Sequence, residues 1–542
     1  MREIRSSGSV GERGGNEPLY PERVTRDTKD MGKRQFLFGS VSGVVQLVFI
    51  AALAIECIPV FIGKLGSEAY GVFAVVSLVG NLTVFANLGT NRSLVKFIAE
   101  QGRTRESSYD IAITLLILIA TIVPITLLFI LLREVVLIKL FNVPPGLFDQ
   151  AMVLYICLLF SNLFLLMGQS FSSILSALQK IYINNLLQMV YNALYYGSII
   201  AMLLLGYGLA EIGYVILLSA FAWFFLVFYY SLRLWGKLEI GGITHHYKRI
   251  ARKQFGYGSK IWFSEMVAFF IEPLTKIFIS NFVGIREVGF FDIALKVKAQ
   301  FQGLITRLLD PFYPFISQIS DSKKLQRIIN DVEQKFLFLS IPLIAILLFT
   351  LRPLLSLWLG AHSNEEITVS SILITCTFLL TMSVLPMYYF LLAKDRVGRA
   401  TVLNLVTVGV NGLLFFIFYR GYGFYASVIS LCGSAMVAFF LTLYYQKKYL
   451  DCILFSSPEP VLKIITAFSI LVLTNYLITR FTPSAILQIL FVTVNTIILS
   501  VITYRFLNLV GKTDIETYFG RENVVSRFLV RVFVKSVTRV AP

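Results

Sequence analysis

The feature that most constrains the fold of this chain is a series of apolar runs, each near twenty residues long, that covers almost its whole length. A helix of about 20 apolar residues crosses roughly 30 Å of hydrocarbon, and only helices or closed barrels satisfy their own backbone there. Only 15% of the residues are charged, against about 25% in a soluble domain. Hydropathy therefore predicts an all-α integral membrane protein with about fourteen membrane-spanning helices. Their expected ranges are 36–62, 70–95, 111–132, 150–176, 183–206, 209–234, 256–283, 288–315, 334–350, 367–392, 398–419, 423–446, 462–479 and 484–507.

A short motif occurs twice, 219 residues apart, each time near the expected beginning of a long apolar helix. Residues 33–40 and residues 252–259 both read as two basic residues, Gln, Phe, any residue, an aromatic residue, Gly and Ser. Two pairs of asparagines share this offset: Asn185 with Asn404, and Asn192 with Asn411. Matches in register indicate an internal duplication, and duplicated halves in a membrane protein usually form a transporter with a central site between them.

The position of the repeat also predicts how the chain is organised. Six expected helices precede the basic segment 236–255 and six follow it, so the two copies keep the same orientation, as parallel repeats. The expected parts are a disordered cytoplasmic tail (1–35), an N-lobe of six helices (36–235), a basic cytoplasmic loop (236–255), a C-lobe of six helices (256–446), two extra helices (447–507) and a basic amphipathic cytoplasmic tail (508–542).

The net charge of +17 is distributed unevenly between the two sides of the predicted bundle. The loops on the side of both termini hold 22 Lys and Arg residues, against 7 in the loops on the opposite side. The positive-inside rule therefore places both termini in the cytoplasm, in an inner or plasma membrane. The basic residues would face the anionic cytoplasmic leaflet, so membrane lipids, and not nucleic acid, are the expected partners of this charge.

Ionisable residues inside the predicted spans are concentrated in the helices 36–62, 256–283 and 288–315. A charge at membrane depth is costly, so such residues usually pair with one another or line a polar cavity. In the second and third of these helices their spacing puts them on one face. The ionisable residues are Glu56 in the first helix, Glu265, Glu272 and Lys276 in the second, and Asp292, Lys296, Lys298, Arg307 and Asp310 in the third. The neutral Gln300 belongs to the same polar stripe of the third helix.

These charges allow two interpretations. The acids and bases nearly balance, and Glu272 with Lys276 or Asp292 with Lys296 stand at the spacing of helical ion pairs, which fits a network that only locks helices together. A stripe along a whole helix exceeds that need and favours a hydrated central cavity, in which Lys and Arg would bind an anionic headgroup and carboxylates would respond to protons or Na⁺. Because the second copy holds most of the charges, we expect it to hold most of the site.

Two segments of the first half show a familiar pattern. Residues 65–73 read Leu-Gly-Ser-Glu-Ala-Tyr-Gly-Val-Phe, and residues 86–96 read Ala-Asn-Leu-Gly-Thr-Asn-Arg-Ser-Leu-Val-Lys. They resemble the first two helices of the polysaccharide transporter family, the Wzx-like flippases for lipid-linked oligosaccharides. That family belongs to the multidrug/oligosaccharidyl-lipid/polysaccharide exporter superfamily. Family members often carry Asp where Asn87 stands here, so one expected charge is absent.

The resemblance implies a V-shaped bundle that opens alternately to either side and accepts a polyprenyl-pyrophosphate-linked sugar headgroup, with a polysaccharide polymerase and a chain-length regulator as candidate partners. By this analogy the headgroup would meet Arg92, Lys296, Lys298 and Arg307, with Asn87, Asn91 and Gln300 beside them. Coupling or gating would fall to Glu56, Glu265, Glu272, Lys276, Asp292 and Asp310. No cofactor or metal is expected, with H⁺ or Na⁺ as the candidate coupling ion.

Three other functions compete with this hypothesis. A lipid II-type flippase shares fourteen helices and a cationic cavity. A cation-coupled multidrug exporter usually has twelve helices and a mainly acidic cavity, which this chain does not match. A membrane-embedded glycosyltransferase or polymerase is disfavoured because the sequence shows no nucleophile triad, phosphate loop or metal cluster. The chain is therefore expected to be a transporter and not an enzyme.

Overall fold

The computed structural model describes residues 22–239, 241–309, 316, 319, 321–394, 396–450 and 458–506. Within these ranges the chain is helical, and no strand occurs. The first half contains α1 (Glu22–Val76), η1 (Ser77–Asn81), α2 (Leu82–Ala86), α3 (Thr90–Gln101), α4 (Arg105–Leu131), η2 (Val135–Leu140), η3 (Pro145–Leu147), α5 (Phe148–Ala177), α6 (Ile181–Leu204) and α7 (Leu209–Trp235). The second half contains α8 (Ile243–Phe269), α9 (Ile271–Phe282), α10 (Ile285–Leu309), α12 (Ser322–Leu359), η4 (Gly360–His362), α13 (Glu365–Ala393), α14 (Val397–Tyr422) and α15 (Tyr425–Leu450). Helices α16 (Pro458–Phe481) and α17 (Ala485–Phe506) follow.

The two halves pack their helices in the same pattern, which confirms the duplication. Helix α1 packs on α6 as α8 packs on α14, and α5 packs on α7 as α13 packs on α15. The repeated asparagines join equivalent helices: Asn185 Nδ2 on α6 donates to Ser42 Oγ on α1 at 2.9 Å, and Asn404 Nδ2 on α14 donates to the Ser264 carbonyl on α8 at 2.9 Å. Each half is therefore a copy of one helical framework.

Helices occupy every range that hydropathy predicts for a span, although the number of crossings stays a prediction. Ten helices among the described residues are long and apolar enough to cross a membrane. Helix α1 contains the first expected span and the beginning of the second, which continues through η1, α2 and α3. It is broken at Gly66, where φ is 84° and ψ is 168°. Only glycine adopts this backbone conformation without strain, so the break stands where the sequence pattern separates 36–62 from 70–95.

Two parts of the expected organisation differ from the structure. The predicted disordered tail 1–35 is helical from Glu22, and the predicted loop 236–255 is helical from Ile243. Both segments are polar and basic extensions of apolar helices. Hydropathy detects the apolar part of such a helix and stops where the charges begin, although Lys and Arg are good helix formers. The predicted amphipathic tail 508–542 lies outside the described residues.

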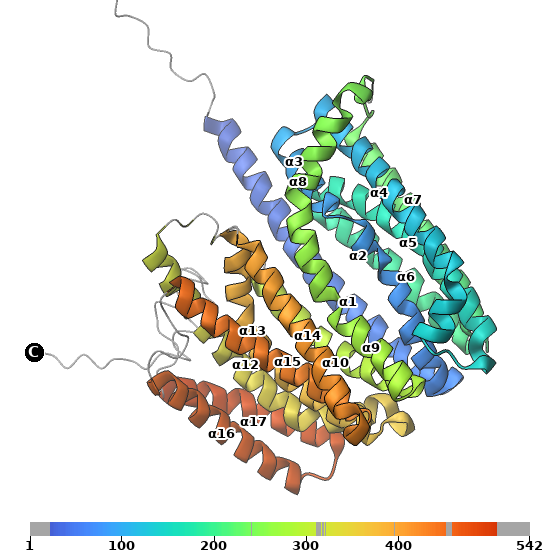
Figure 1. Cartoon of the computed structure of the whole chain (residues 1–542). Coiled ribbons are helices and arrows are strands. Elements are labelled where there is room, and N and C mark those ends of the chain that lie inside the picture. The colour runs from blue at the N-terminus through green and yellow to red at the C-terminus, as the bar shows by residue number, and fades with distance from the viewer. Residues whose placement is uncertain are drawn as a thin grey trace, which may run out of the picture.

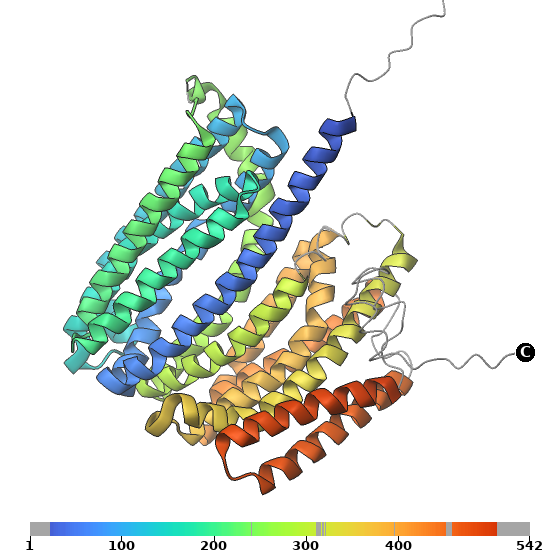
Figure 2. The same cartoon turned by 180° about the vertical axis from the view of Figure 1, so that it is seen from behind.

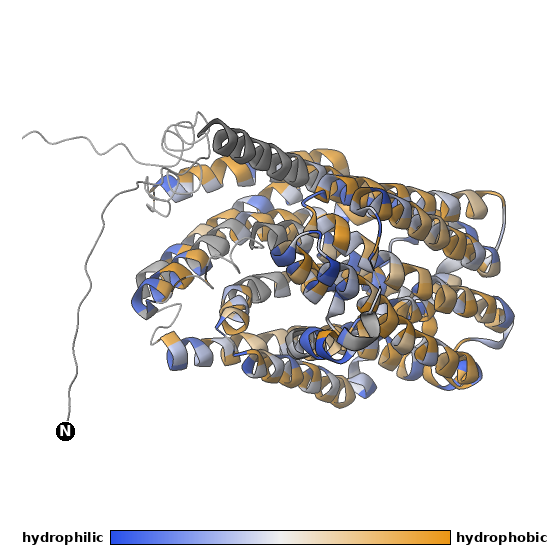
Figure 3. Cartoon of the chain, turned by 90° about the horizontal axis from the view of Figure 1, so that it is seen from above, coloured by the Kyte–Doolittle hydropathy of each residue, from blue (hydrophilic) through white to orange (hydrophobic). Residues whose placement is uncertain are grey.

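The two halves lie side by side and diverge toward the side where the chain begins (Figure 1). Helices α16 and α17 pack on α12, on the face of the second half that is remote from the first (Figure 2). Seen from above, hydrophobic residues predominate along the helices of both halves (Figure 3). The chain therefore has the V-shaped, two-lobed form that was expected, and we use N-lobe and C-lobe for the two halves.

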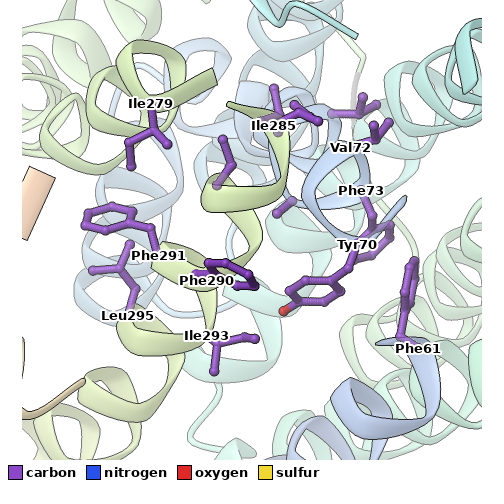
Figure 4. Packing of buried hydrophobic residues seen from close by; sticks show 14 of the residues in the cluster. Phe61, Tyr70, Val72, Phe73, Ile279, Ile285, Phe290, Phe291, Ile293 and Leu295 are labelled. Atoms are coloured by element: carbon purple, nitrogen blue, oxygen red, sulfur yellow. The ribbon is translucent and has the colours of Figure 1, made fainter. Parts of the chain in front are cut away.

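The lobes meet in a buried apolar contact at the end opposite the divergence. Phe61, Tyr70 and Phe73 of α1 share one cluster with Phe291 and Leu295 of α10 (Figure 4). The backbone approach is very close here, because a Cβ added at Gly71 would lie 1.9 Å from the carbonyl oxygen of Ile285. Position 71 therefore tolerates only glycine while the lobes are in contact.

Candidate functional site

Two cavities lie on either side of the junction between the lobes. The N-lobe cavity, of about 380 Å³, is lined by α1, η1, α5, α6 and α7, and by three residues from α9 and α10. The C-lobe cavity, of about 570 Å³, is lined by α8, α9, α10, α13, α14 and α15. Leu78, Asn81 and Lys276 line both. The two cavities therefore adjoin each other at these three residues.

A cluster of charges closes the C-lobe side of the N-lobe cavity. Asp292 is its centre: Oδ1 lies 2.5 Å from Lys276 Nζ, and Oδ2 lies 3.0 Å from Lys296 Nζ. Tyr70 donates its hydroxyl to Asp292 Oδ2 at 2.7 Å and accepts from Lys296 Nζ at 2.9 Å. Two ammonium groups thus share one carboxylate, which leaves one positive charge in excess. The Lys296 side chain is 38% exposed, against 11% for Lys276, so Lys296 presents this charge to the cavity.

Aromatic and amide side chains form the opposite wall of the N-lobe cavity. Tyr191, Tyr195 and Tyr196 of α6 line it together with Asn192. The rings form a continuous group, with centroids 5.9 Å apart for Tyr191 and Tyr195 and 4.9 Å apart for Tyr195 and Tyr196. Tyrosines combine a large apolar face with a polar tip, so this wall suits a ligand that has both apolar faces and hydroxyl groups.

The C-lobe cavity carries a different set of polar groups. Glu272 and Lys298 both line it, and the two side chains are close enough to interact electrostatically. Gln302, Tyr388 and Asn404 line it as well. Glu272 and Lys298 balance each other in charge, and Lys276, which also lines this cavity, is paired with Asp292. Among the described residues, no group of three or more His, Cys, Asp or Glu side chains could hold a metal ion.

The predicted ion pairs form only in part. Asp292 and Lys296 pair as their spacing indicates. The predicted pairing of Lys276 with Glu272 does not occur, because Lys276 reaches across to Asp292 on α10 instead. An acid four residues away on the same helix competes for a lysine with acids on neighbouring helices. A buried carboxylate such as that of Asp292 is a strong competitor.

Several predicted headgroup residues lie away from both cavities. Arg92 on α3 pairs with Glu265 on α8 at 2.7 Å, and both side chains are largely exposed. Asn87 Oδ1 accepts from the Asn91 backbone N–H at 3.2 Å, next to the left-handed turn that precedes α3. Asn91 Oδ1 is buried and accepts from Ser170 Oγ at 2.8 Å. The contacts of these residues hold α3 in place, so the polar side chains have partners within the protein and need no ligand.

The remaining predicted residues are not placed at a cavity. Glu56 is exposed, and Gln300 is half-buried; neither lines either cavity among the described residues. The Arg307 side chain and the whole of Asp310 lie outside the part of the chain that the structure describes. Their predicted roles stay predictions.

The structure adds a polar network that the sequence reasoning missed. Gln254, in the second copy of the repeated motif, donates from Nε2 to the Asp110 carbonyl at 3.1 Å and accepts from Thr114 Oγ1 at 2.9 Å. Lys253 Nζ lies 3.5 Å from Asp110 Oδ2 and 4.0 Å from the centroid of the Phe97 ring. The motif therefore docks α8 of the C-lobe sequence onto α3 and α4 of the N-lobe. Asp110 precedes the predicted span 111–132 by one residue, so the sequence pattern does not mark it as an intramembrane charge.

Comparison with protein families identifies one match. The model of a family described as polysaccharide biosynthesis protein matches residues 39–320, which is just over half of the chain. No curated protein shows a significant match.

Comparison with solved structures identifies the fold. The lipid II flippase MurJ in an inward closed conformation superposes with a TM-score of 0.71 at 18% identity, over 86% of this chain and 100% of MurJ. An inward-facing multidrug resistance MATE transporter of the MOP superfamily gives 0.61 at 14% identity, over 76% of this chain and 98% of the transporter. The MATE multidrug transporter DinF-BH gives 0.58 at 12% identity, over 77% of this chain and 97% of the transporter. With ten apolar helices in its described part, the chain is therefore a multi-pass membrane protein with the fold of these transporters.

Proposed function

Because the chain belongs to the polysaccharide biosynthesis protein family, we propose that it flips a polyprenyl-pyrophosphate-linked oligosaccharide for the synthesis of a surface polysaccharide. In this proposal the chain lies in the cell membrane with both termini in the cytoplasm, and it moves the headgroup to the outer leaflet by alternating access. The observation that carries the proposal is the cluster of Lys276, Asp292 and Lys296, which keeps one positive charge in excess at the junction of the cavities. A diphosphate is the part of the substrate that would match this charge.

The size and lining of the cavities support a headgroup that carries sugars. Each cavity falls in the range of about 300–1,000 Å³ that is usual for small-molecule sites, and the two adjoin at Asn81 and Lys276. A diphosphate at Lys296 would place the first sugars against Tyr191, Tyr195 and Tyr196, whose hydroxyls can exchange hydrogen bonds with sugar hydroxyls. The polyprenyl tail would stay in the lipid.

The headgroup proposal is tested with Lys296→Ala and Lys298→Ala in a strain that lacks the chromosomal gene. We expect Lys296→Ala to reduce surface polysaccharide about tenfold or more, because it removes a charge-assisted contact, and to accumulate lipid-linked repeat units in the cell. Lys298→Ala should have a smaller effect, because Glu272 already lies near that lysine. Lys64→Ala is the matched control, because Lys64 is exposed and lines neither cavity. Wild-type polysaccharide levels in both cavity variants, with the protein present in the membrane, would contradict the proposal.

The proposed coupling ion is H⁺ or Na⁺, and Glu272 is the proposed coupling residue in the C-lobe cavity. Glu272→Gln should weaken the dependence of transport on an imposed ion gradient, because the neutral amide cannot change charge. The measurement is transport of the lipid-linked substrate in proteoliposomes with and without a proton or sodium gradient. An unaltered gradient response would exclude Glu272 from this role. A polymerase and a chain-length regulator remain proposed partners.

A lipid II-type flippase is the second candidate, and the fold similarity to MurJ supports it. Lipid II is also a lipid-linked anionic headgroup, so the cationic cluster does not separate the two substrates. Rescue of a strain depleted of its own lipid II flippase would favour this candidate, and rescue of surface polysaccharide alone would favour the first.

A multidrug exporter is the third candidate, and the fold similarity to MATE transporters supports it. The excess positive charge beside Lys296 disfavours cationic drugs, because a like charge would be repelled. Expression in a pump-deficient host should therefore leave resistance to cationic dyes unchanged. Raised resistance would favour drug export over lipid flipping.

A further inference from the structure

A buried acid on α12 is paired with a buried amide on α15, away from both cavities. Glu333 and Gln446 each have an exposed fraction of 0%. Gln446 Nε2 donates to Glu333 Oε1. The second carboxyl oxygen, Glu333 Oε2, and the amide oxygen, Gln446 Oε1, are also buried, and neither has a hydrogen-bond partner in the part of the chain that the structure describes. This residue pair therefore contains two buried acceptors without a hydrogen bond. Buried polar atoms in folded proteins rarely lack a hydrogen bond.

Among the described residues, no counter-charge is paired with Glu333. The nearby positions Ile329 and Val332 on α12 and Leu450 on α15 belong to one buried apolar cluster. The other titratable or charged groups that the structure describes on the elements nearby include Lys323, Lys324, Arg327 and Asp331 on α12, Tyr388, Tyr389 and Lys394 on α13, Arg396 and Arg399 by α14, Tyr444, Tyr445, Lys447, Lys448 and Tyr449 on α15, Lys463 on α16 and Tyr504 on α17. The Lys335 side chain lies outside the described residues. Glu333 forms no ion pair with any group that the structure describes. Lys394 donates to the Ile319 carbonyl, and Lys447 and Lys448 are exposed.

A single proton satisfies both unpaired oxygens. A neutral carboxylic acid has one O–H donor and one C=O acceptor, and a primary amide has an N–H donor and a C=O acceptor. Glu333 can therefore accept from Gln446 through Oε1 and donate to Gln446 through a protonated Oε2. An ionised Glu333 would leave its charge buried and unpaired. A metal ion is a poor alternative, because hard cations take six or more oxygen ligands and this pair offers two unsatisfied oxygens.

We propose that Glu333 and Gln446 form a proton-binding site in the C-lobe, at which protonated Glu333 holds α12 against α15. Binding adds one proton to the carboxylate, and release returns it to water and leaves a buried negative charge beside the Gln446 carbonyl. Release therefore weakens the contact between the two helices. The site does not depend on which substrate the protein carries.

The electrostatics of the position agree with this assignment. Glu333 lies before the membrane-spanning part of α12, which covers Ser340–His362. Burial raises the pKa of the Glu333 carboxyl well above its usual value, and the hydrogen bond from Gln446 opposes this rise only in part. A raised pKa in the folded protein means that stability is highest below the unfolded pKa of about 4.3 and is lost as pH rises through the folded pKa.

The first test compares wild type with Glu333→Gln as full-length proteins in detergent micelles. The amide keeps both hydrogen bonds to Gln446 and cannot titrate, so Glu333→Gln should fold and should lack one component of the pH dependence. For wild type we expect the folding equilibrium constant to fall by up to tenfold per pH unit, relative to Glu333→Gln, between the unfolded and the folded pKa. Thermal unfolding over a series of pH values measures this difference. Identical pH profiles for the two proteins would overturn the proposal.

The second test does not depend on unfolding. The infrared spectrum of the wild-type protein at neutral pH should contain the band of a protonated carboxylic acid, and Glu333→Gln should remove it. The exchanged pair Glu333→Gln with Gln446→Glu is the matched control, since it restores one acid and one amide in the same space. We expect it to restore both the infrared band and the pH dependence. Absence of the band in the wild-type protein would overturn the proposal, whatever the stability of the variants.

Discussion

The two cavities differ in chemistry although the two lobes that contain them are copies of one framework. The N-lobe cavity has tyrosines on one wall and the cluster of Lys276, Asp292 and Lys296 on the other. The C-lobe cavity shares Lys276 with the N-lobe cavity and adds Glu272 and Lys298, which lie near each other. The charged wall of the N-lobe cavity comes from α9 and α10, which belong to the other copy. Duplication therefore supplied two equivalent frameworks, and the site formed where the second copy presents its charges to the first.

The strongest way to break this arrangement is to remove Asp292, which joins the charges at the junction. Asp292→Ala should lower the free energy of unfolding by roughly 3 kcal/mol, because it leaves the nearly buried Lys276 without its counter-ion. Asp292→Asn, which keeps the hydrogen bond from Tyr70 but loses the charge, should have a smaller effect. Thermal unfolding in detergent measures both. Equal stability of Asp292→Ala and wild type would mean that the cluster does not hold the lobes together.

The equivalence of the two frameworks is tested by the repeated asparagines. Asn185→Ala and Asn404→Ala should each lower the free energy of unfolding by about 0.6 kcal/mol, the average for hydrogen bonds between membrane helices, for which about 1.7 kcal/mol is the upper limit. The double variant should show the sum, because the two bonds lie in different lobes. A loss confined to one of the two positions would show that the copies no longer share this bond as a structural element.

The smallest effect is expected for the ion pair between Arg92 and Glu265. Both side chains are largely exposed, so a double-mutant cycle with Arg92→Ala and Glu265→Ala should give a coupling of about 0.2–1 kcal/mol. Added salt should reduce this coupling. A coupling well above this range, or one that salt does not change, would indicate that the pair is shielded from water in the membrane.

Residue patterns located the helices because hydrocarbon demands long apolar runs, and this demand is visible in the sequence. They placed Lys296 and Asp292 together because both stand on one helix at a fixed spacing. They could not show that Lys276 reaches Asp292, because periodicity gives the face of a helix and not the neighbour that this face meets. The family resemblance implies a headgroup role for Arg92 and Asn91, which stays a prediction, but it gives no sign that their side chains contact Glu265 on α8 and Ser170 on α5. Tyr70 and Tyr195 received no assignment, because an uncharged aromatic residue in an apolar helix carries no signal of its own.

Adjacent residues of α8 are bound to opposite lobes. Ser264 accepts from Asn404 in the C-lobe, and Glu265 pairs with Arg92 in the N-lobe. A few turns earlier, Gln254 is bound to Asp110 in the N-lobe. In the alternating access proposed above, a separation of the lobes at this level would require α8 to release either Asn404 or Arg92, while the neighbouring residue could stay bound to the other lobe. Such a step would exchange a few identified bonds, and it would not require the whole bundle to bend gradually.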